Sequence, residues 1–567
     1  MTTSDAALDV VGELTSRQVC WLYGGWHVAE LSGFRVLAAD PPTDERSSFA
    51  PVRGLLRRVL PLVDGDLVAE CAPELRHLLG PEGLPGSRPL SDLMQMPTGV
   101  SRMLPLESEL VFRIVVKIGL LVQEGMRRRG EEPVLFFPRF DLADRPTTVL
   151  VHHLWVRGVR LVLGCPERHP WWERIGGAEV TLPGDPLPCP PGDDEEAHTV
   201  RAARRALTLG LPDAADVWRA AVDLAGRWFN PGVVLDLAPL TEGHVPETER
   251  AESLGVALAT LGRFHDAREQ FDRGYDAATT PVDRARLAMF TALVSAKRLS
   301  DMETAQAGVA RGLADLAECD TEDAQVALER AWLLNLEALV AYRAGRHDDA
   351  MQSTRTALQL TKPYRSEECV AVKTNLVVNT SIIFETRGEP ERALKVWHLF
   401  LRIFDRAGDM FVHFYHFRQA GLLAKAGDPL AVPGYERVAA MAADLGHLPS
   451  LLYSTRALAR LTYLAGDFTT ARAHTSRLLE LCIRCGDVPG LARAWCLLAA
   501  CHAASGAIPE VGHALDQAVS TAAPDAERAQ LADLRSRWHA GEAIDWAAHL
   551  PGPPPTTLRY PSTLFLP

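Results

Sequence analysis

The chain has 567 residues, which is too long for one ordinary hydrophobic core and predicts two to four domains. Hydrophobic residues make up 47% of it and charged residues 23%, a balance typical of globular proteins rather than disordered or fibrous ones. The 59 basic residues against 72 acidic ones give a net charge of −13, which argues against direct nucleic-acid binding.

No stretch approaches the roughly 20 consecutive apolar residues of a membrane span, and the start, MTTSDAALDV, lacks the features of a signal peptide. We therefore expect a cytoplasmic protein without membrane contact, its ten cysteines reduced. Cys482, Cys485, Cys496 and Cys501 have a spacing that could suggest zinc. Because all four fall within helical patterns, where a free cysteine often serves as a small buried hydrophobe, we expect no metal and no cofactor.

The composition and periodicity of the sequence change three times along the chain. Residues 1–178 mix short apolar runs with helical patterns and predict a small α/β domain. Residues 179–196 are rich in proline, glycine and acids and predict a linker. Residues 197–545 show an almost wholly helical spacing of Ala, Leu and Arg, whereas prolines exclude a regular helix in the tail, 546–567. The fold class is therefore mainly α.

One segment of the α/β domain has a distinctive order of residues. An apolar run at 133–137 precedes Pro138 and Arg139, and a turn with Ala143 and Asp144 then leads into a helical pattern. Further strand patterns lie at 33–37 and 160–164. The arrangement resembles the Walker B region of the MalT and LuxR-type regulators, which are signal-transducing ATPases with helical repeats. The resemblance implies a degenerate P-loop ATPase fold.

The departures from that family concern its chemistry. The acidic pair of the family falls on Pro138 and Arg139, and neither a proline nor a cation can hold Mg²⁺ or orient a water. A phosphate-binding loop needs Gly-Lys-Ser/Thr, but no lysine of this chain follows a glycine, and residues 22–31 lack the motif. Asp141 and Asp144 are alternative acids, although Asp144 matches the acid of the family's turn. We therefore predict no catalytic residue in this domain.

A short unit recurs in the helical part: a glycine followed five positions later by an alanine. Clear copies begin at Gly262, Gly345, Gly388 and Gly466, and weaker ones at Gly210, Ser300, Gly427 and Gly506. A glycine ends a helix by adopting a left-handed conformation, and the alanine marks the place where a second helix lies close to the first. The pattern is similar to the tetratricopeptide consensus, with a period longer than the usual ~34 residues. It implies a solenoid of about seven or eight helix pairs.

In tetratricopeptide arrays the first helix of each pair lines a concave face that binds ligands. The resemblance predicts a groove for a protein or peptide partner. The ligand-contact positions of the family fall about 13, 10, 3 and 2 residues before each landmark glycine. Aromatic, arginine and asparagine side chains suit such a surface. The candidates are Trp332, Asn335, Tyr342, Arg343, Asn375, Phe414, Phe417, Lys425, Tyr453, Arg456, Arg460 (at the intervening position), Tyr463 and Arg493.

An alternative for these residues is structural. Trp332, Phe414 and Phe417 could pack between neighbouring repeats, and the arginines could form a solvated face. With either outcome, the sequence predicts a non-catalytic scaffold or regulator that binds a polypeptide, with a homodimer possible. Two other functions stay open: a nucleotide-sensing regulator without the usual Walker motifs, and an accessory protein of a biosynthetic pathway with chemistry at the seam between the two halves.

Overall fold

The computed structural model describes residues 18–24, 36–80 (without 44 and 46), 90, 107–128, 134–182 and 189–556 (without 229, 321, 400–408, 523–524 and 554). The chain divides into two compact units, and the boundary falls between Leu376 and Val377. The first unit contains the α/β domain and the first helical repeats, and the second contains the later repeats. Among the described segments, no helix has the length and apolarity needed to cross a membrane.

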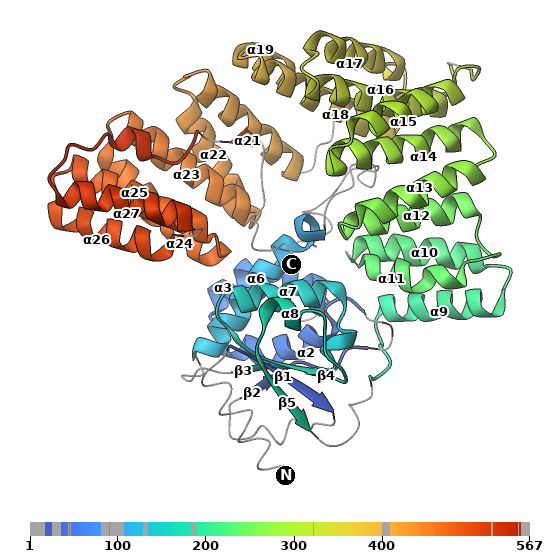
Figure 1. The fold of residues 1–567 in the computed structure, drawn as a ribbon, viewed down its shortest axis with the longest axis horizontal. Helices are drawn as coiled ribbons and strands as arrows, with labels where there is room; N and C mark the ends of the chain where they lie inside the picture. The colour runs from blue at the N-terminus through green and yellow to red at the C-terminus, as the bar shows by residue number, and fades with distance from the viewer. Residues whose placement is uncertain are drawn as a thin grey trace. The chain divides into compact units, whose positions relative to one another are not determined.

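The α/β domain is built on a parallel five-stranded sheet of order β2-β3-β4-β1-β5 (Figure 1). Its strands are β1 (Val19–Gly24), β2 (Val36–Ala38), β3 (Val134–Phe137), β4 (Arg160–Cys165) and β5 (Ala178–Leu182). The central strands are near-continuous apolar runs because helices cover a parallel sheet on both faces. The helices of this domain are α2 (Ala50–Val59), α3 (Gly65–Glu70), α4 (Ala72–Leu79), α6 (Glu107–Arg128), α7 (Arg145–Val156) and α8 (Trp172–Ile175), with 3₁₀ turns η2 (Leu60–Leu62) and η4 (Phe140–Leu142).

Strand β5 lies where the sequence predicted the beginning of the linker. Its residues pair with β1, and Val180 stands opposite Leu22 in the register. The alternation of apolar and polar residues in Ala-Glu-Val-Thr-Leu is that of an edge strand with one buried face. The short run is followed so closely by prolines and glycines that its strand pattern is easily missed.

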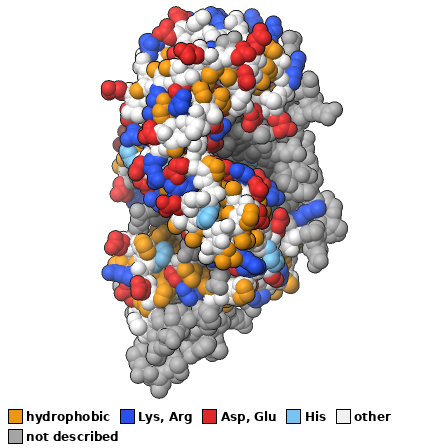
Figure 2. Space-filling model, turned by 90° about the vertical axis from the view of Figure 1, so that its right-hand side faces the viewer, with side chains coloured by type: hydrophobic (Ala, Val, Ile, Leu, Met, Phe, Trp, Pro, Cys, Tyr) orange, Lys and Arg blue, Asp and Glu red, His pale blue; other side chains and the backbone are white. Residues whose placement is uncertain are grey.

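The rest of the first unit is helical, and its helices pack in consecutive pairs (Figure 1). They are α9 (Glu195–Leu209), α10 (Ala214–Arg227), α11 (Pro231–Leu237), η5 (Ala238–Leu240), α12 (Glu247–Thr260), α13 (Phe264–Ala277), α14 (Pro281–Val294), the π-helical turn η6 (Ser295–Leu299), α15 (Met302–Asp315), α16 (Ala324–Arg343) and α17 (His347–Thr361). On the side shown in Figure 2, acidic and basic side chains are interspersed with apolar ones, as on an ordinary solvated surface.

The second unit continues the same pairing after α18 (Glu367–Thr386), the helix in which the boundary between the units falls. Its helices are α19 (Pro390–Trp397), α21 (Asp409–Lys425), α22 (Ala431–Asp444), α23 (Leu448–Leu464), α24 (Phe468–Cys485), α25 (Val488–Ala504), α26 (Ile508–Thr521), α27 (Asp525–His539) and the 3₁₀ turn η7 (Trp546–His549). The predicted class, a helical solenoid preceded by a small α/β domain, is confirmed.

The landmark residues act as the repeat pattern predicted. All eight have positive φ angles, and they end first helices: Gly210, Gly262, Ser300, Gly345, Gly388, Gly427, Gly466 and Gly506. The alanines five positions after the four clear landmarks, Ala267, Ala350, Ala393 and Ala471, are fully buried. A larger side chain at these positions would separate the two helices of a pair, so the small residue is required by the packing.

Candidate functional site

The first place to look for chemistry is the end of β3, where the resemblance would put metal-binding acids. Pro138 follows the strand directly, and Arg139 adopts a left-handed conformation with φ 49°. The guanidinium of Arg139 donates to the Asp141 carboxylate at 3.2 Å, so the nearest acid is already paired. The segment expected to replace the phosphate loop continues into residues 25–35, which lie outside the described part of the chain.

Asp144 has a structural role. One carboxylate oxygen accepts from the backbone N–H groups of Phe49 and Thr147, both at 2.9 Å, and the other accepts from the Thr147 hydroxyl at 2.7 Å. Asp144 thereby caps the N-terminus of α7. Complete burial raises its pKa to about 6, against the effect of these hydrogen bonds. Its contacts are therefore those of a helix cap.

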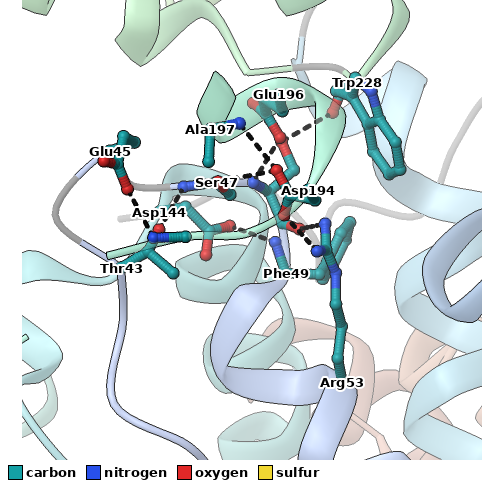
Figure 3. A network of polar contacts seen from close by, with 12 residues as sticks. Thr43, Glu45, Ser47, Phe49, Arg53, Asp144, Asp194, Glu196, Ala197 and Trp228 are labelled. Atoms are coloured by element: carbon teal, nitrogen blue, oxygen red, sulfur yellow. Dashed lines mark hydrogen bonds and ion pairs between the residues drawn. The ribbon is translucent and has the colours of Figure 1, made fainter. Parts of the chain in front are cut away.

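The N-terminus of helix α9 lies beside Asp144 (Figure 3). In Figure 3 the turn that follows β2 meets the N-terminus of α9, where Asp194 caps the helix at Ala197 N and pairs with Arg53. The buried Glu196 carboxylate accepts from Ser48 N at 2.7 Å, the Ser48 hydroxyl at 3.1 Å and Asn230 Nδ2 at 2.9 Å. Buried hydrogen bonds thus join the turn after β2 to the start of α9.

Glu196 lies in the seam between the α/β domain and the first repeat, and its pKa is well above that of an ordinary glutamate. Burial raises its pKa to about 7, and the negative charge of Asp144 adds to the increase, so that together they outweigh the hydrogen bonds from Ser48 and Asn230. Perturbed carboxyls often mark catalytic sites. In this seam, however, both carboxyls are engaged by donors from the helix cap and the turn, and their contacts join the α/β domain to the first repeat.

The repeats of the first unit do not present the predicted groove residues as an open surface. Trp332 and Asn335 are buried in helix packing, with exposed fractions of 2% and 5%, so their assignment to a partner-binding surface was wrong. The physical reason is that Trp332 belongs to the apolar core cluster that α14 and α16 share, and Asn335 is buried on the same helix α16. Tyr342 lies against His347 with ring centroids 5.7 Å apart, and Arg343 donates to the Ala296 carbonyl.

Two aromatic candidates of the second unit are also packing residues. Phe417 is fully buried against Tyr435 of the paired helix α22, which corrects the prediction that it lines the groove. Phe414 is half-buried and meets Trp397 edge to face, with ring centroids 5.8 Å apart. Asn375, on α18, is half-buried, and its role in binding stays a prediction.

In the second unit, a segment near the C-terminal end of the chain lies along the first helix of each of several helix pairs. We call residues 546–556 the tail segment, and the side of α18, α21, α23 and α25 that it contacts the tail face. At the beginning of the segment, Trp546 and Leu550 pack on a cluster that includes Leu497, Ala500 and Tyr463. The Cys496 thiol donates to the His549 carbonyl at 3.8 Å, and the Arg460 guanidinium donates to the Pro551 carbonyl.

The other end of the tail segment meets a cluster of charges. The Thr556 hydroxyl donates to both Glu385 carboxylate oxygens, at 2.8 and 3.1 Å, and the Thr556 carbonyl accepts from Arg418 at 3.4 Å. Lys425 and Arg418 both pair with Glu385. Gly421 lies directly beneath the segment, since a Cβ there would stand 3.0 Å from the Thr556 Cα. The tail face therefore holds this segment of the chain by contacts to its backbone and to one hydroxyl.

Arg418 is the anchor of this cluster. It is fully buried, donates to the Ser381 hydroxyl and to Glu385, both at 3.0 Å, and stands over the Trp397 ring at 5.3 Å. Burial lowers its pKa, although the Glu385 charge opposes this effect. Burial alone would raise the pKa of Glu385, but the hydrogen bond from Lys425 and the charge of Arg418 outweigh it and keep that pKa below its usual value.

Of the candidates in the second unit, Arg460 and Tyr463 contact the tail segment directly, and Lys425 reaches it through Glu385. Other candidates are held by partners within the repeats: Arg456 pairs with Asp487 at 2.9 Å and stands 5.2 Å from the Tyr453 ring, and Arg493 pairs with Glu527 at 2.8 Å.

Sequence reasoning missed three residues of the tail face, Arg418, Gly421 and Glu385. They stand nine, six and three positions before their landmark glycines, and Arg460 and Tyr463 occupy the same six and three positions in the next repeat. Residues at spacings of three lie on one side of a helix. That stripe was the available signal; the prediction used the position three residues before the glycine but followed positions six and nine in no repeat except at Arg460.

The four cysteines of the possible zinc site are buried thiols. Burial raises the pKa of Cys482 and Cys496 to about 12 and that of Cys501 to about 11, so they stay protonated at neutral pH. Within the described ranges, no group of three or more His, Cys, Asp or Glu side chains could hold a metal ion.

No protein-family model and no curated protein sequence matches the chain. Among solved structures, it is similar to a signal transduction ATPase with numerous domains and a tetratricopeptide repeat sensor from Pyrococcus horikoshii, with 9% identity, a TM-score of 0.49, and coverage of 96% of this chain and 93% of that one. It is also similar to apo RapI, with 13% identity, a TM-score of 0.38 and coverage of 62% and 100%. Aspartyl phosphate phosphatase F from Bacillus subtilis is similar with 10% identity and a TM-score of 0.35, and the match covers 63% of this chain and 96% of that one. At these identities each likeness concerns the fold alone.

Proposed function

We propose that this chain is a non-catalytic binding protein that holds an extended segment of a protein or peptide partner against the tail face of its later repeats. The observation that supports the proposal most is the tail segment itself. Beyond the 3₁₀ turn η7 it lies on that face, where its Pro551 and Thr556 carbonyls accept from Arg460 and Arg418.

The chemistry of the tail face suits a polypeptide ligand. An extended chain brings backbone carbonyls that need donors, and guanidinium groups supply several donors in a fixed geometry. Tyr463 and the small residues of α25 add an apolar surface on which a side chain such as Leu550 can rest. Contacts to the backbone contribute affinity, and the apolar contacts select which side chains fit.

The α/β domain, in this proposal, is structural support. The places for metal-binding acids hold Pro138 and an Arg139 that is paired with Asp141, and the neighbouring Asp144 caps α7. An ATPase of the kind that this domain resembles would need acids that hold Mg²⁺ and orient water. We therefore assign the activity to binding by the repeats rather than to nucleotide chemistry.

Charge reversal at Arg460 tests the proposal. The Arg460→Glu variant replaces a donor by an acceptor that repels backbone carbonyls, and we expect it to weaken the capture of partners at least tenfold, about 1.4 kcal/mol or more. The measurement compares the proteins that the wild type and the variant recover from the source cells, with binding constants for the recovered partners. The matched control is Arg472→Glu, which makes the same charge change on the exposed side of α24. Equal partner binding by wild type and Arg460→Glu would refute the proposal.

A further inference from the structure

The tail segment fills its site incompletely. A cavity of about 650 Å³ lies beside it, lined on the tail side by residues that include Leu550 and Gly552 and on the repeat side by Arg493 and Glu527. Gly552 contributes no side chain to this space, and a Cβ built on it would meet no atom within 4 Å. The site therefore has room for a side chain at this position that the chain's own tail does not provide.

The cavity also contains an unused acceptor. One oxygen of the Glu527 carboxylate pairs with Arg493 at 2.8 Å, while Oε2 is buried without a hydrogen-bond partner among the described residues. Asp533 lines the same space. Because a buried acceptor without a partner costs about 1–3 kcal/mol, a donor placed in the cavity would be favourable. With two acids and one arginine in this part of the lining, the donor that fits best is a cation.

The sequence of the tail segment explains how it can occupy the site without this contact. Residues 550–556 read Leu-Pro-Gly-Pro-Pro-Pro-Thr and carry no charged side chain. Prolines favour a stiff extended chain and so reduce the conformational entropy that is lost on binding. The anchors, at Leu550, Pro551 and Thr556, use an apolar side chain, carbonyls and one hydroxyl.

We infer that the tail segment is a displaceable occupant of the site, and that the partner supplies an extended, proline-containing segment with a basic side chain at the place of Gly552. This inference rests on the proposed function and adds the class of ligand. The basic side chain enters the cavity and donates to Glu527, while the backbone of the segment takes the place of the tail on Arg460 and Arg418. The tail is present at a high effective concentration because it is tethered, and it excludes weaker ligands.

The test uses full-length chains and synthetic peptides. The probe is a fluorescein-labelled peptide of residues 546–558, measured by fluorescence anisotropy. In the tail-released variant, Leu550→Asp with Thr556→Glu, one charge enters an apolar cluster and the other opposes Glu385, so the chain's own tail leaves the face. The control variant, Gly552→Ser with Pro553→Ser, changes two exposed tail residues and keeps the tail bound.

We expect the probe to bind the tail-released variant at least tenfold more tightly than the wild type and the control variant, because the tethered competitor is gone. Two further peptides, Gly552→Lys and Gly552→Glu, differ only in the sign of one charge. The Lys peptide should bind about tenfold more tightly than the Glu peptide. This ratio should fall toward one when the protein also carries Glu527→Gln, which separates the contact from the general attraction of an acidic protein for a cation.

Three outcomes would overturn the inference. One is failure of the probe to bind the tail-released variant; a second is a Lys-to-Glu ratio that Glu527→Gln leaves unchanged. The third is a wild-type dimer in light scattering that dissociates in the tail-released variant, because the segment on the face would then come from a second copy. If the double variant does not fold by circular dichroism, Thr556→Glu alone releases the far end of the tail and should bind the probe more tightly than the wild type; equal affinity would also overturn the inference. Partner capture that still depends on Arg460 would leave the proposed function standing in each case.

Discussion

Replacing Arg418 with alanine is expected to destabilise the second unit by about 3–5 kcal/mol, the usual cost of removing one partner from a buried ion pair. Arg418 is fully buried, and its removal leaves Ser381 without its donor and Glu385 with only Lys425 as a cationic partner. It also removes the contact with the Trp397 ring and the donor to the Thr556 carbonyl. The tail segment should therefore detach as the unit loosens.

The measurement is hydrogen exchange in increasing urea, read on peptides from α21, because two units need not unfold in one step. Arg477→Ala is the matched control: Arg477 is half-exposed and pairs with Glu480 one turn away, so its loss should cost less than about 1 kcal/mol. A loss below about 1 kcal/mol for Arg418→Ala would show that the buried cluster does not stabilise the repeats.

The second large effect is a dependence of stability on pH at the seam between the α/β domain and the first repeat. The pKa of Glu196 is about 7 in the folded chain against 4.5 for the ordinary group. The folded chain therefore holds this proton more tightly than the unfolded chain, so stability is greatest below about pH 4.5 and falls as the pH rises to about 7. The expected fall is about 3 kcal/mol, and the raised pKa of Asp144 adds to it in the same direction.

The Glu196→Gln variant should lose most of this slope, because an amide does not titrate. Its control is Glu195→Gln, since Glu195 is the exposed neighbour on the same helix turn. Urea unfolding from pH 4.5 to 8, followed by hydrogen exchange on peptides from α9 and α7, measures the effect. If wild type and Glu196→Gln show the same slope, the buried carboxyl does not govern the stability of the seam.

The repeats were predictable from the sequence because their geometry depends on local rules. A glycine that must adopt positive φ and an alanine that must fit between two helices recur in a fixed relation, so a few residues identify the fold. The α/β domain was predictable from its apolar strand patterns. Strand β5 was missed because its pairing with β1 is a long-range contact that five residues beside a proline-rich stretch do not reveal.

The binding face was predictable only in part. The candidates include Arg460 and Tyr463, which contact the tail segment, but also Trp332 and Phe417, whose aromatic side chains are in the core. An aromatic residue on a helix suits either a core or a ligand surface, and composition does not distinguish the two. The contact between residues 546–556 and four first helices depends on how the chain returns on itself, which periodicity cannot show.

Site-specific photo-crosslinking tests the central claim most directly, that the tail face of the repeats holds an extended segment of another polypeptide. The photoreactive residue benzoylphenylalanine would replace Tyr463, which contacts the tail segment, or Ile483, which is exposed on the outer helix α24. In the source cells, we expect irradiation to join position 463 to a proline-containing segment of a partner, and position 483 to join no partner. If position 463 joins only the chain's own tail while position 483 captures the partner, the tail face is not the binding site.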